Sequence, residues 1–194
     1  MVIQAIEQLE QTEGSITAVL EFVNTRFDGK GGHIERFGSS EDFAGWARER
    51  GLVGDEMVTE SDVAAARELR EALVAVMLAH AGHPDLDEEQ LRDAERKLEH
   101  AGERYPVRIT LSAAGSSIAS QARGAAGVFG TVLAAANDIA AHDAWWRMKG
   151  CCSYPCRHGF VDRTKNGTQR FCSTRCASRA AMRAMRERRR ELGD

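Results

Sequence analysis

Five cysteines, all gathered in residues 151–176 (CCSYPCRHGFVDRTKNGTQRFCSTRC), limit the folds open to this chain more than any other feature. Two pairs, Cys152/Cys156 and Cys172/Cys176, each enclose three residues, and fifteen residues separate the pairs. Such short spacings let two sulfur atoms converge on one metal ion, about 2.3 Å from each. Because four thiolates close a tetrahedral shell and leave no position for water, the sequence predicts one structural Zn²⁺.

Other ligand sets stay open. Cys151 adjoins Cys152 and would enclose four residues with Cys156; we favour Cys152, which gives both pairs the same spacing and leaves Cys151 spare. His158 is another alternative, because an imidazole can replace a thiolate. Disulfides need an oxidising compartment, an iron–sulfur site has a different spacing, and buried free thiols are the remaining alternative.

The segments around the cysteines predict a small fold. Strand-like runs at residues 159–163 and 168–171 flank Asn166-Gly167, a dipeptide typical of a two-residue hairpin turn. Ser173 is the expected N-cap of a helix over residues 177–190, which are rich in helix-forming residues. The chain thus offers a tight turn at the first cysteine pair (the knuckle), then a hairpin, then a helix that begins at the second pair. This order predicts a treble-clef-like four-cysteine zinc finger.

The helix after the last cysteine carries a stripe of arginines. They follow one another at steps of three or four residues, which keeps them on one helix face: Arg175, Arg179, Arg183, Arg186 and Arg190. Small and apolar residues fall on another side, which we expect to pack on the hairpin: Ala177, Ala181, Ala184 and Met185. A guanidinium stripe beside a zinc site is typical of a nucleic-acid contact. The alternatives are a solvated basic face and a face that docks on the acidic part of the chain.

Charge divides the chain sharply. Residues 147–194 contain thirteen Lys or Arg against four Asp or Glu, a net charge of +9, whereas the rest of the chain carries −12. A basic end on an acidic body indicates an anionic partner for that end. The acidic N-terminus is unlike a signal peptide, and no apolar run approaches the roughly 18 residues of a membrane span, so we expect a cytoplasmic protein without a membrane partner.

Residues 1–149 are predicted to form a mostly helical domain. Expected helices follow cap signals at Ser15, at Ser39 or Ser40, at Thr59 with Asp62, and at Asp87, and a further helix follows Gly124. The helix that ends near residue 80 is the most apolar and is the expected core helix. Residues 105–111 alternate apolar and polar side chains, which predicts a strand paired with residues 116–120. The expected fold is therefore mainly α with a small β-hairpin, followed by the finger in residues 150–194.

Two polar residues stand out in the first domain: Asn24 ends an apolar helix face, and Arg70 interrupts an apolar helix. Asn24 and Arg70 are candidates to line a pocket for an anionic small-molecule effector. The alternative, which we favour, is that Asn24 caps a helix end and Arg70 forms a surface salt bridge. No Ser-His-Asp order, supported carboxylate pair or nucleotide-binding fingerprint is present, so we do not expect an enzyme.

The cysteine region resembles the CGNR-type zinc finger of bacterial regulators. The resemblance rests on the cysteine pairs, Phe-Val-Asp-Arg at 160–163, Asn166-Gly167, Arg-Phe-Cys-Ser at 170–173 and the basic helix. The family's name-giving tetrapeptide reads Cys-Ala-Ser-Arg at 176–179 here. The family's first pair often encloses four residues, which argues for Cys151.

The front of the chain resembles the ABATE domain that usually precedes this finger. The segments that carry the resemblance occur in the family's order: residues 20–25, 43–47, 51–53 and 68–72. Together the two resemblances imply a DNA-binding transcription regulator, whose first domain senses an effector or mediates assembly. A homodimer is expected because one finger offers few base contacts. The alternative function is a protein–protein interaction module or an RNA binder stabilised by zinc.

Overall fold

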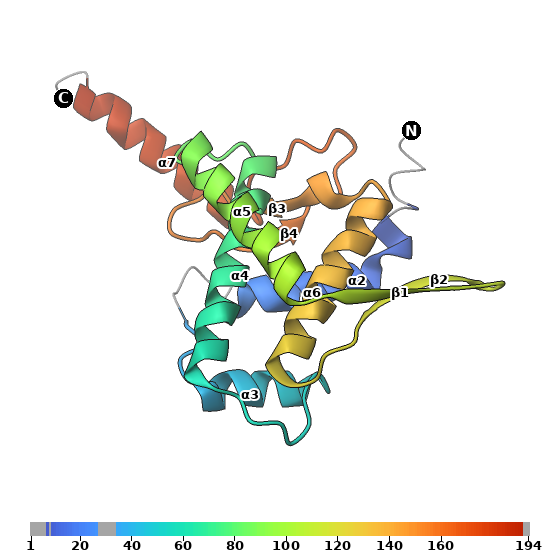
Figure 1. Ribbon diagram of the computed structural model, residues 1–194. Helices are drawn as coiled ribbons and strands as arrows, with labels where there is room; N and C mark the ends of the chain where they lie inside the picture. Colours follow the sequence, from blue (N-terminus) through green and yellow to red (C-terminus); the bar gives the residue numbers. More distant parts are fainter. Residues whose placement is uncertain (1–6, 8, 27–33, 192–194) are drawn as a thin grey trace.

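The computed structural model describes residue 7 and residues 9–26 and 34–191. Three helices, α2 (Glu13–Val23), α4 (Glu60–His80) and α6 (Gly124–Ala141), form the centre of the molecule (Figure 1). Helices α3 (Ser40–Glu49) and α5 (Glu88–Arg104) pack around them, and short 3₁₀ turns follow α2 (η1, Asn24–Arg26) and α6 (η2, Trp145–Arg147). Their apolar side chains meet in one core, which includes Phe22, Phe37, Phe43 and Phe129.

Most of the predicted helix starts are confirmed. Ser39 accepts a hydrogen bond from the backbone N–H of Asp42, and Thr59 and Asp87 each form a complete capping box. The cap at Ser15 is wrong, because α2 already begins at Glu13. The Ser15 hydroxyl instead donates a 2.5 Å hydrogen bond to the Asp138 carboxylate, which joins α2 to α6.

Helix α4 is the core helix that its apolar spacing predicts, with Val63, Leu69, Leu73 and Met77 all buried. Among the described residues, α6 is the one helix that is long and apolar enough to cross a membrane by length and composition. The expectation that no stretch approaches a spanning length was therefore too strict. Helix α6 packs against α2, α4 and β2, and the burial of its apolar residues in the core accounts for its composition.

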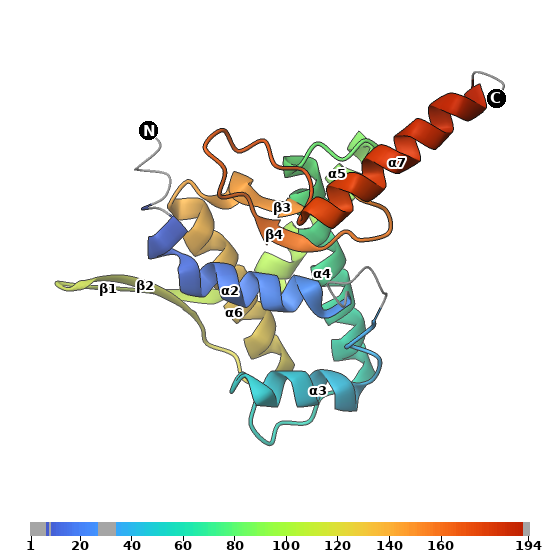
Figure 2. The same ribbon diagram turned by 180° about the vertical axis from the view of Figure 1, so that it is seen from behind.

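The predicted strand pair is confirmed as β1 (Val107–Ser112) and β2 (Gly115–Ser120), an antiparallel hairpin in which Ile109 is opposite Ile118. The first strand begins two residues later than expected because α5 extends to Arg104, with Tyr105 as its C-cap; the Tyr105 ring is buried 4.8 Å from that of Phe129. Figures 1 and 2 show the hairpin projecting from the helical body on the side away from the last helix.

The pairing predicted within the finger is wrong. Strand β4 (Gly159–Val161) pairs with β3 (Met148–Gly150), whereas residues 168–171 form no strand. A buried carboxylate replaces the expected ladder, because the backbone N–H of Gln169 donates to Asp162 Oδ2 at 2.8 Å. Gly167 does adopt the positive φ expected of a turn residue, +60°.

Helix α7 (Thr174–Glu191) begins after Ser173, whose side chain and carbonyl cap it as predicted. The expected packing of its apolar side on a hairpin is wrong. Ala181, Ala184 and Met185 are exposed, and Cys176 is the one buried residue of the helix. Figures 1 and 2 show why: the first half of α7 lies near the rest of the molecule, and its last turns extend away from it.

Candidate metal centre and nucleic-acid interface

Four cysteine sulfur atoms meet where β3, the following knuckle and the start of α7 converge. The Sγ atoms of Cys151, Cys156, Cys172 and Cys176 all lie within 4.8 Å of one another. The Cys156–Cys172 and Cys172–Cys176 Sγ distances are 3.8 and 3.7 Å. A tetrahedral zinc ion bound at about 2.3 Å places its sulfur ligands about 3.8 Å apart, so these residues fit the metal.

The structure corrects the choice of the first ligand. Cys151 belongs to the cluster, and Cys152 does not: its thiol points to the carbonyl oxygen of Ala81, 3.6 Å away. The cause is the alternation of side chains in extended chain. Gly150 abuts Leu78 of the helical body, so Cys151 faces the finger and Cys152 faces the body again.

Electrostatics within the cluster favour a cation. Hydrogen bonds from Cys156 and Cys172 lower the pKa of the Cys151 thiol far below its ordinary value. The same contact with Cys151 raises the pKa values of Cys156 and Cys172. One thiolate therefore opposes the ionisation of its neighbours, and a divalent ion removes this opposition. The pKa of Cys152 is raised chiefly by burial, which keeps it a neutral thiol.

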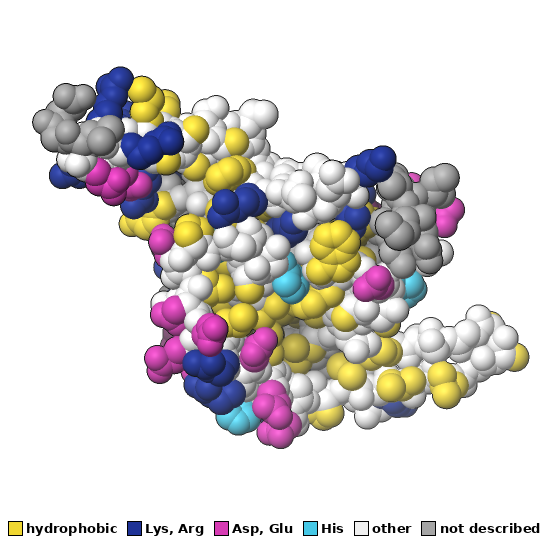
Figure 3. Space-filling model, turned by 90° about the horizontal axis from the view of Figure 1, so that it is seen from above, with side chains coloured by type: hydrophobic (Ala, Val, Ile, Leu, Met, Phe, Trp, Pro, Cys, Tyr) yellow, Lys and Arg dark blue, Asp and Glu magenta, His cyan; other side chains and the backbone are white. Residues whose placement is uncertain are grey.

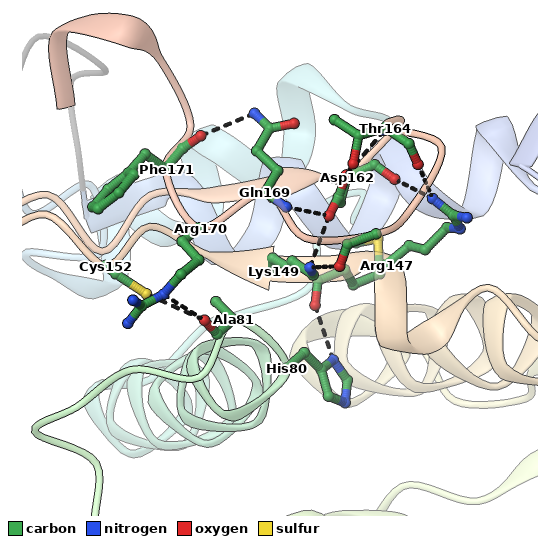
Figure 4. A network of polar contacts seen from close by, with 12 residues as sticks. His80, Ala81, Arg147, Lys149, Cys152, Asp162, Thr164, Gln169, Arg170 and Phe171 are labelled. Atoms are coloured by element: carbon green, nitrogen blue, oxygen red, sulfur yellow. Dashed lines mark hydrogen bonds and ion pairs between the residues drawn. The ribbon is translucent and has the colours of Figure 1, made fainter. Parts of the chain in front are cut away.

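A buried carboxylate organises the rest of the finger (Figure 4). Asp162 is fully buried and accepts a 2.7 Å hydrogen bond from Lys149 Nζ, whose side chain is also buried. Its other oxygen accepts from the backbone N–H of Thr164 at 2.9 Å, and Arg147 donates to the carbonyl oxygens of Asp162 and Thr164. Burial opposes ionisation of Asp162, but these donors outweigh it and lower its pKa. Lys149 lies on β3 and Arg147 ends η2 directly before it, and neither was among the site residues predicted from the sequence.

The finger is joined to the helical body through Asn24 and Gly159. The Asn24 amide donates to the Gly159 carbonyl at 3.0 Å and accepts from its N–H at 2.8 Å. A Cβ at Gly159 would lie 2.8 Å from Val23 and 3.0 Å from Met77, so only glycine allows β4 this close to the body. Asn24 thus serves as a clamp between finger and body.

The C-terminal end of α4 forms a second joint. Arg170 Nε and Nη2 donate to the carbonyls of Ala81 and Gly82 at 3.2 and 2.8 Å, where a helix end has unpaired acceptors (Figure 4). The ring of His80 is 2.9 Å from the Met148 carbonyl, and burial lowers the pKa of this histidine. The basic finger residue Arg170 therefore contributes to the fold.

Arg70, the other candidate effector residue, is 2% exposed and paired within the chain. It makes two 2.7 Å hydrogen bonds to the Glu35 carboxylate, and it also donates to Thr25 and Glu71. The salt bridge expected for Arg70 exists, but it is buried and not on the surface. Arg70 and Asn24 are directed to different partners, so the structure does not bring them together around one ligand.

The arginine stripe lies on α7, as its spacing predicts. Arg175, Arg183, Arg186 and Arg190 are exposed, and Arg179 is partly buried. Arg183 is held by the Glu187 carboxylate at 2.9 Å and lies over the Tyr154 ring, 5.3 Å from its centroid. Figure 3 shows Lys and Arg side chains spread along the projecting helix, together with apolar side chains.

Comparisons with known families agree with this geometry. The ABATE family, described as "Putative stress-induced transcription regulator", matches residues 17–145, and the CGNR zinc finger matches residues 147–189. A comparison with curated proteins gives no match. The finger match and the sulfur cluster together identify one structural Zn²⁺ site. Since the first match alone covers well over half of the sequence, the chain belongs to the ABATE family of transcription regulators and carries a CGNR zinc finger at its C-terminal end.

Proposed function

We propose that this regulator binds duplex DNA through α7, with zinc ligated by Cys151, Cys156, Cys172 and Cys176. The projection of α7 carries this proposal most directly. The zinc site fixes the first turn of the helix, and the turns beyond it present arginines to solvent on a single face. Arginine pairs with phosphates, and bidentately with guanine in the major groove.

The arginines of the stripe have different environments. Arg183 forms an ion pair with Glu187 and lies over the Tyr154 ring, so its guanidinium is held in place by neighbours within the protein. Arg186 and Arg190 lie further along the helix, where the neighbouring residues are exposed as well. We propose that these two, with Arg175 and Arg179, make the principal contacts to DNA.

We further propose that residues 1–149 sense an effector or mediate assembly, and that residues 150–194 are the DNA-binding part. We assign no catalytic activity, because four thiolates leave no open coordination position for a substrate. A cytoplasmic location fits the five free cysteines, which need a reducing compartment.

The test is binding of the zinc-loaded chain to fragments of its own upstream region and to scrambled duplex, across a salt series. Arg179→Glu with Arg186→Glu changes the stripe, and Arg188→Glu with Arg189→Glu makes the same charge change elsewhere on α7. We expect preference for the native fragment, and the stripe variant should lose this preference. Its slope of log affinity against log salt should fall by about two, one for each lost phosphate contact, and the control's by less.

Other outcomes refute the proposal. Equal losses in both variants would mean that net charge, and not the stripe, attaches the protein. Preference for single-stranded or structured RNA over duplex would establish the RNA-binding alternative. Absence of nucleic-acid binding at low salt would favour a basic module that docks on an acidic protein.

A further inference from the structure

The β1–β2 hairpin exposes an apolar face that the proposed function does not use. Val107, Ile109 and Leu111 alternate along β1, and their side chains are 38, 64 and 79% exposed. Opposed residues of an antiparallel pair share a face, so Ile118 lies beside Ile109 on this same side. A two-stranded ribbon is marginal in water unless its apolar face is covered.

A groove lies along β2. It measures about 620 Å³ and is bounded by β2, the start of α2 and the second half of α6, with Ala18, Ile118, Ala134 and Ala141 in its lining. At the base of the hairpin, Ser120 packs directly on Gly130 of α6. The base of the hairpin therefore rests on the helical body, and the rest of the ribbon projects beyond it (Figure 1).

This region is poor in charge, whereas the body around it is acidic. Residues 107–120 contain one charged residue, Arg108, which lies on the opposite face of the ribbon. Asp138 is the one acidic residue that lines the groove. Residues 1–146 carry a net charge of −12, so two copies of this body repel each other unless they meet through a surface of this kind. Figure 3 shows apolar side chains among polar side chains and backbone on the projecting ribbon, with few charged side chains.

We infer that the hairpin and its groove form the interface of a homodimer, in which the apolar face of each hairpin packs into the groove of the second copy. A two-fold axis requires a self-complementary surface, and here a projecting ribbon adjoins a groove lined by alanine, serine and other small side chains. The three apolar residues of β1 and the fifteen residues that line the groove make eighteen, slightly below the roughly 20–30 per partner of a standard interface.

The position of the hairpin is compatible with DNA binding. It projects on the side of the body opposite to α7, so a dimer formed there leaves both α7 helices uncovered (Figure 2). Two well-separated basic helices then face DNA as a symmetric pair, and a dimeric reader recognises half-sites related by two-fold symmetry. The inference itself rests on the hairpin surface and not on DNA binding.

The test is the oligomeric state of the zinc-loaded full chain, by sedimentation equilibrium over a dilution series without DNA. Ile109→Asp with Leu111→Asp places two charges on the apolar face. Thr110→Asp with Ser112→Asp places the same charges at exposed positions on the opposite face of the same strand. Because all four positions are exposed, both variants should fold, which circular dichroism and zinc content verify.

We expect a dimer for the wild type, an at least tenfold higher dissociation constant for the Ile109/Leu111 variant, and a value near wild type for the control. A wild type that remains monomeric overturns the inference, as does a dimer insensitive to the Ile109/Leu111 change. DNA binding is measured separately: selective binding by a monomer refutes the dimer alone, and a dimer without DNA affinity refutes the proposed function alone.

Discussion

Replacing Cys151 by serine removes a zinc ligand, whereas the same change at the adjacent Cys152 removes a thiol outside the sulfur cluster. The two variants differ from the wild type by one sulfur atom each, one residue apart. Cys151 is fully buried and accepts a hydrogen bond from the backbone N–H of Cys172, as a metal-bound thiolate does. Cys152 instead faces the end of α4.

The two substitutions should differ strongly in how much zinc affinity they remove. Structural zinc sites bind with about 10–16 kcal/mol, so an equal share for each of four thiolates is about 2.5–4 kcal/mol. Cys151→Ser should therefore raise the zinc dissociation constant by roughly 100- to 1,000-fold. Cys152→Ser loses a weak 3.6 Å thiol contact that a hydroxyl can partly replace, so its effect should stay below about 1 kcal/mol.

The assay is competition with a chelator of known zinc affinity, combined with the visible spectrum of the cobalt-substituted protein. The cobalt spectrum reports how many thiolates bind the metal. Wild type and Cys152→Ser should show four thiolates, and Cys151→Ser should show three. Wild-type affinity in Cys151→Ser, together with loss of metal in Cys152→Ser, would refute the ligand assignment and the strand alternation from which it follows.

Three further outcomes follow from the packing and charges. Gly159→Ala should cost about 1–3 kcal/mol of unfolding free energy, because its Cβ meets Val23 and Met77, and urea unfolding at saturating zinc measures this. Glu35→Gln weakens the paired contact with buried Arg70 and should cost about 1–3 kcal/mol at pH 7. Burial opposes ionisation of Glu35, but Arg70 lowers its pKa overall. This stabilisation is full above the unfolded pKa of about 4.3 and is lost as pH falls through the folded pKa. The stability gap between wild type and Glu35→Gln should therefore close in acid; a gap unchanged at pH 3 would contradict the ion pair's role.

The elements that the sequence predicts well are those fixed by local chemistry. Thr59 with Asp62 and Asp87 with Gln90 are complete caps within four residues, so the starts of α4 and α5 follow from short segments. The apolar spacing of α4 and the alternation in β1 also need no knowledge of distant partners. The second cysteine pair, Cys172 and Cys176, is likewise predicted from its local spacing.

The errors concern long-range partners. The first zinc ligand depends on which side of the chain Gly150 presents to Leu78, a contact across 72 positions in the sequence. A usable signal was present, since Met148 is apolar and belongs on the body side; strict alternation then assigns Cys151 to the finger. The partner of β4 was missed because the side chain of Asp162, and not a strand ladder, closes the loop to Gln169. The exposed apolar side of α7 could not be distinguished from a packed one by spacing alone.

The joints between finger and body imply that zinc stabilises more than the finger. Arg170 donates to two carbonyls at the end of α4, and the backbone of Gly159 pairs with both ends of the Asn24 amide. Asn24 and the end of α4 therefore lose hydrogen-bond partners when the finger unfolds. Removing zinc should therefore lower the melting temperature of the helical body and increase amide exchange at the end of α4 and at η1. Helix α3, at the opposite end of the body from the finger, serves as the internal control (Figure 1). If exchange rises only within residues 147–191, the finger is energetically independent and the joints contribute nothing. If amide exchange rises at the α4 end as well, the metal site and the helical body form one cooperative unit. A change in the body can then reach α7, the proposed DNA-binding helix, through the same contacts.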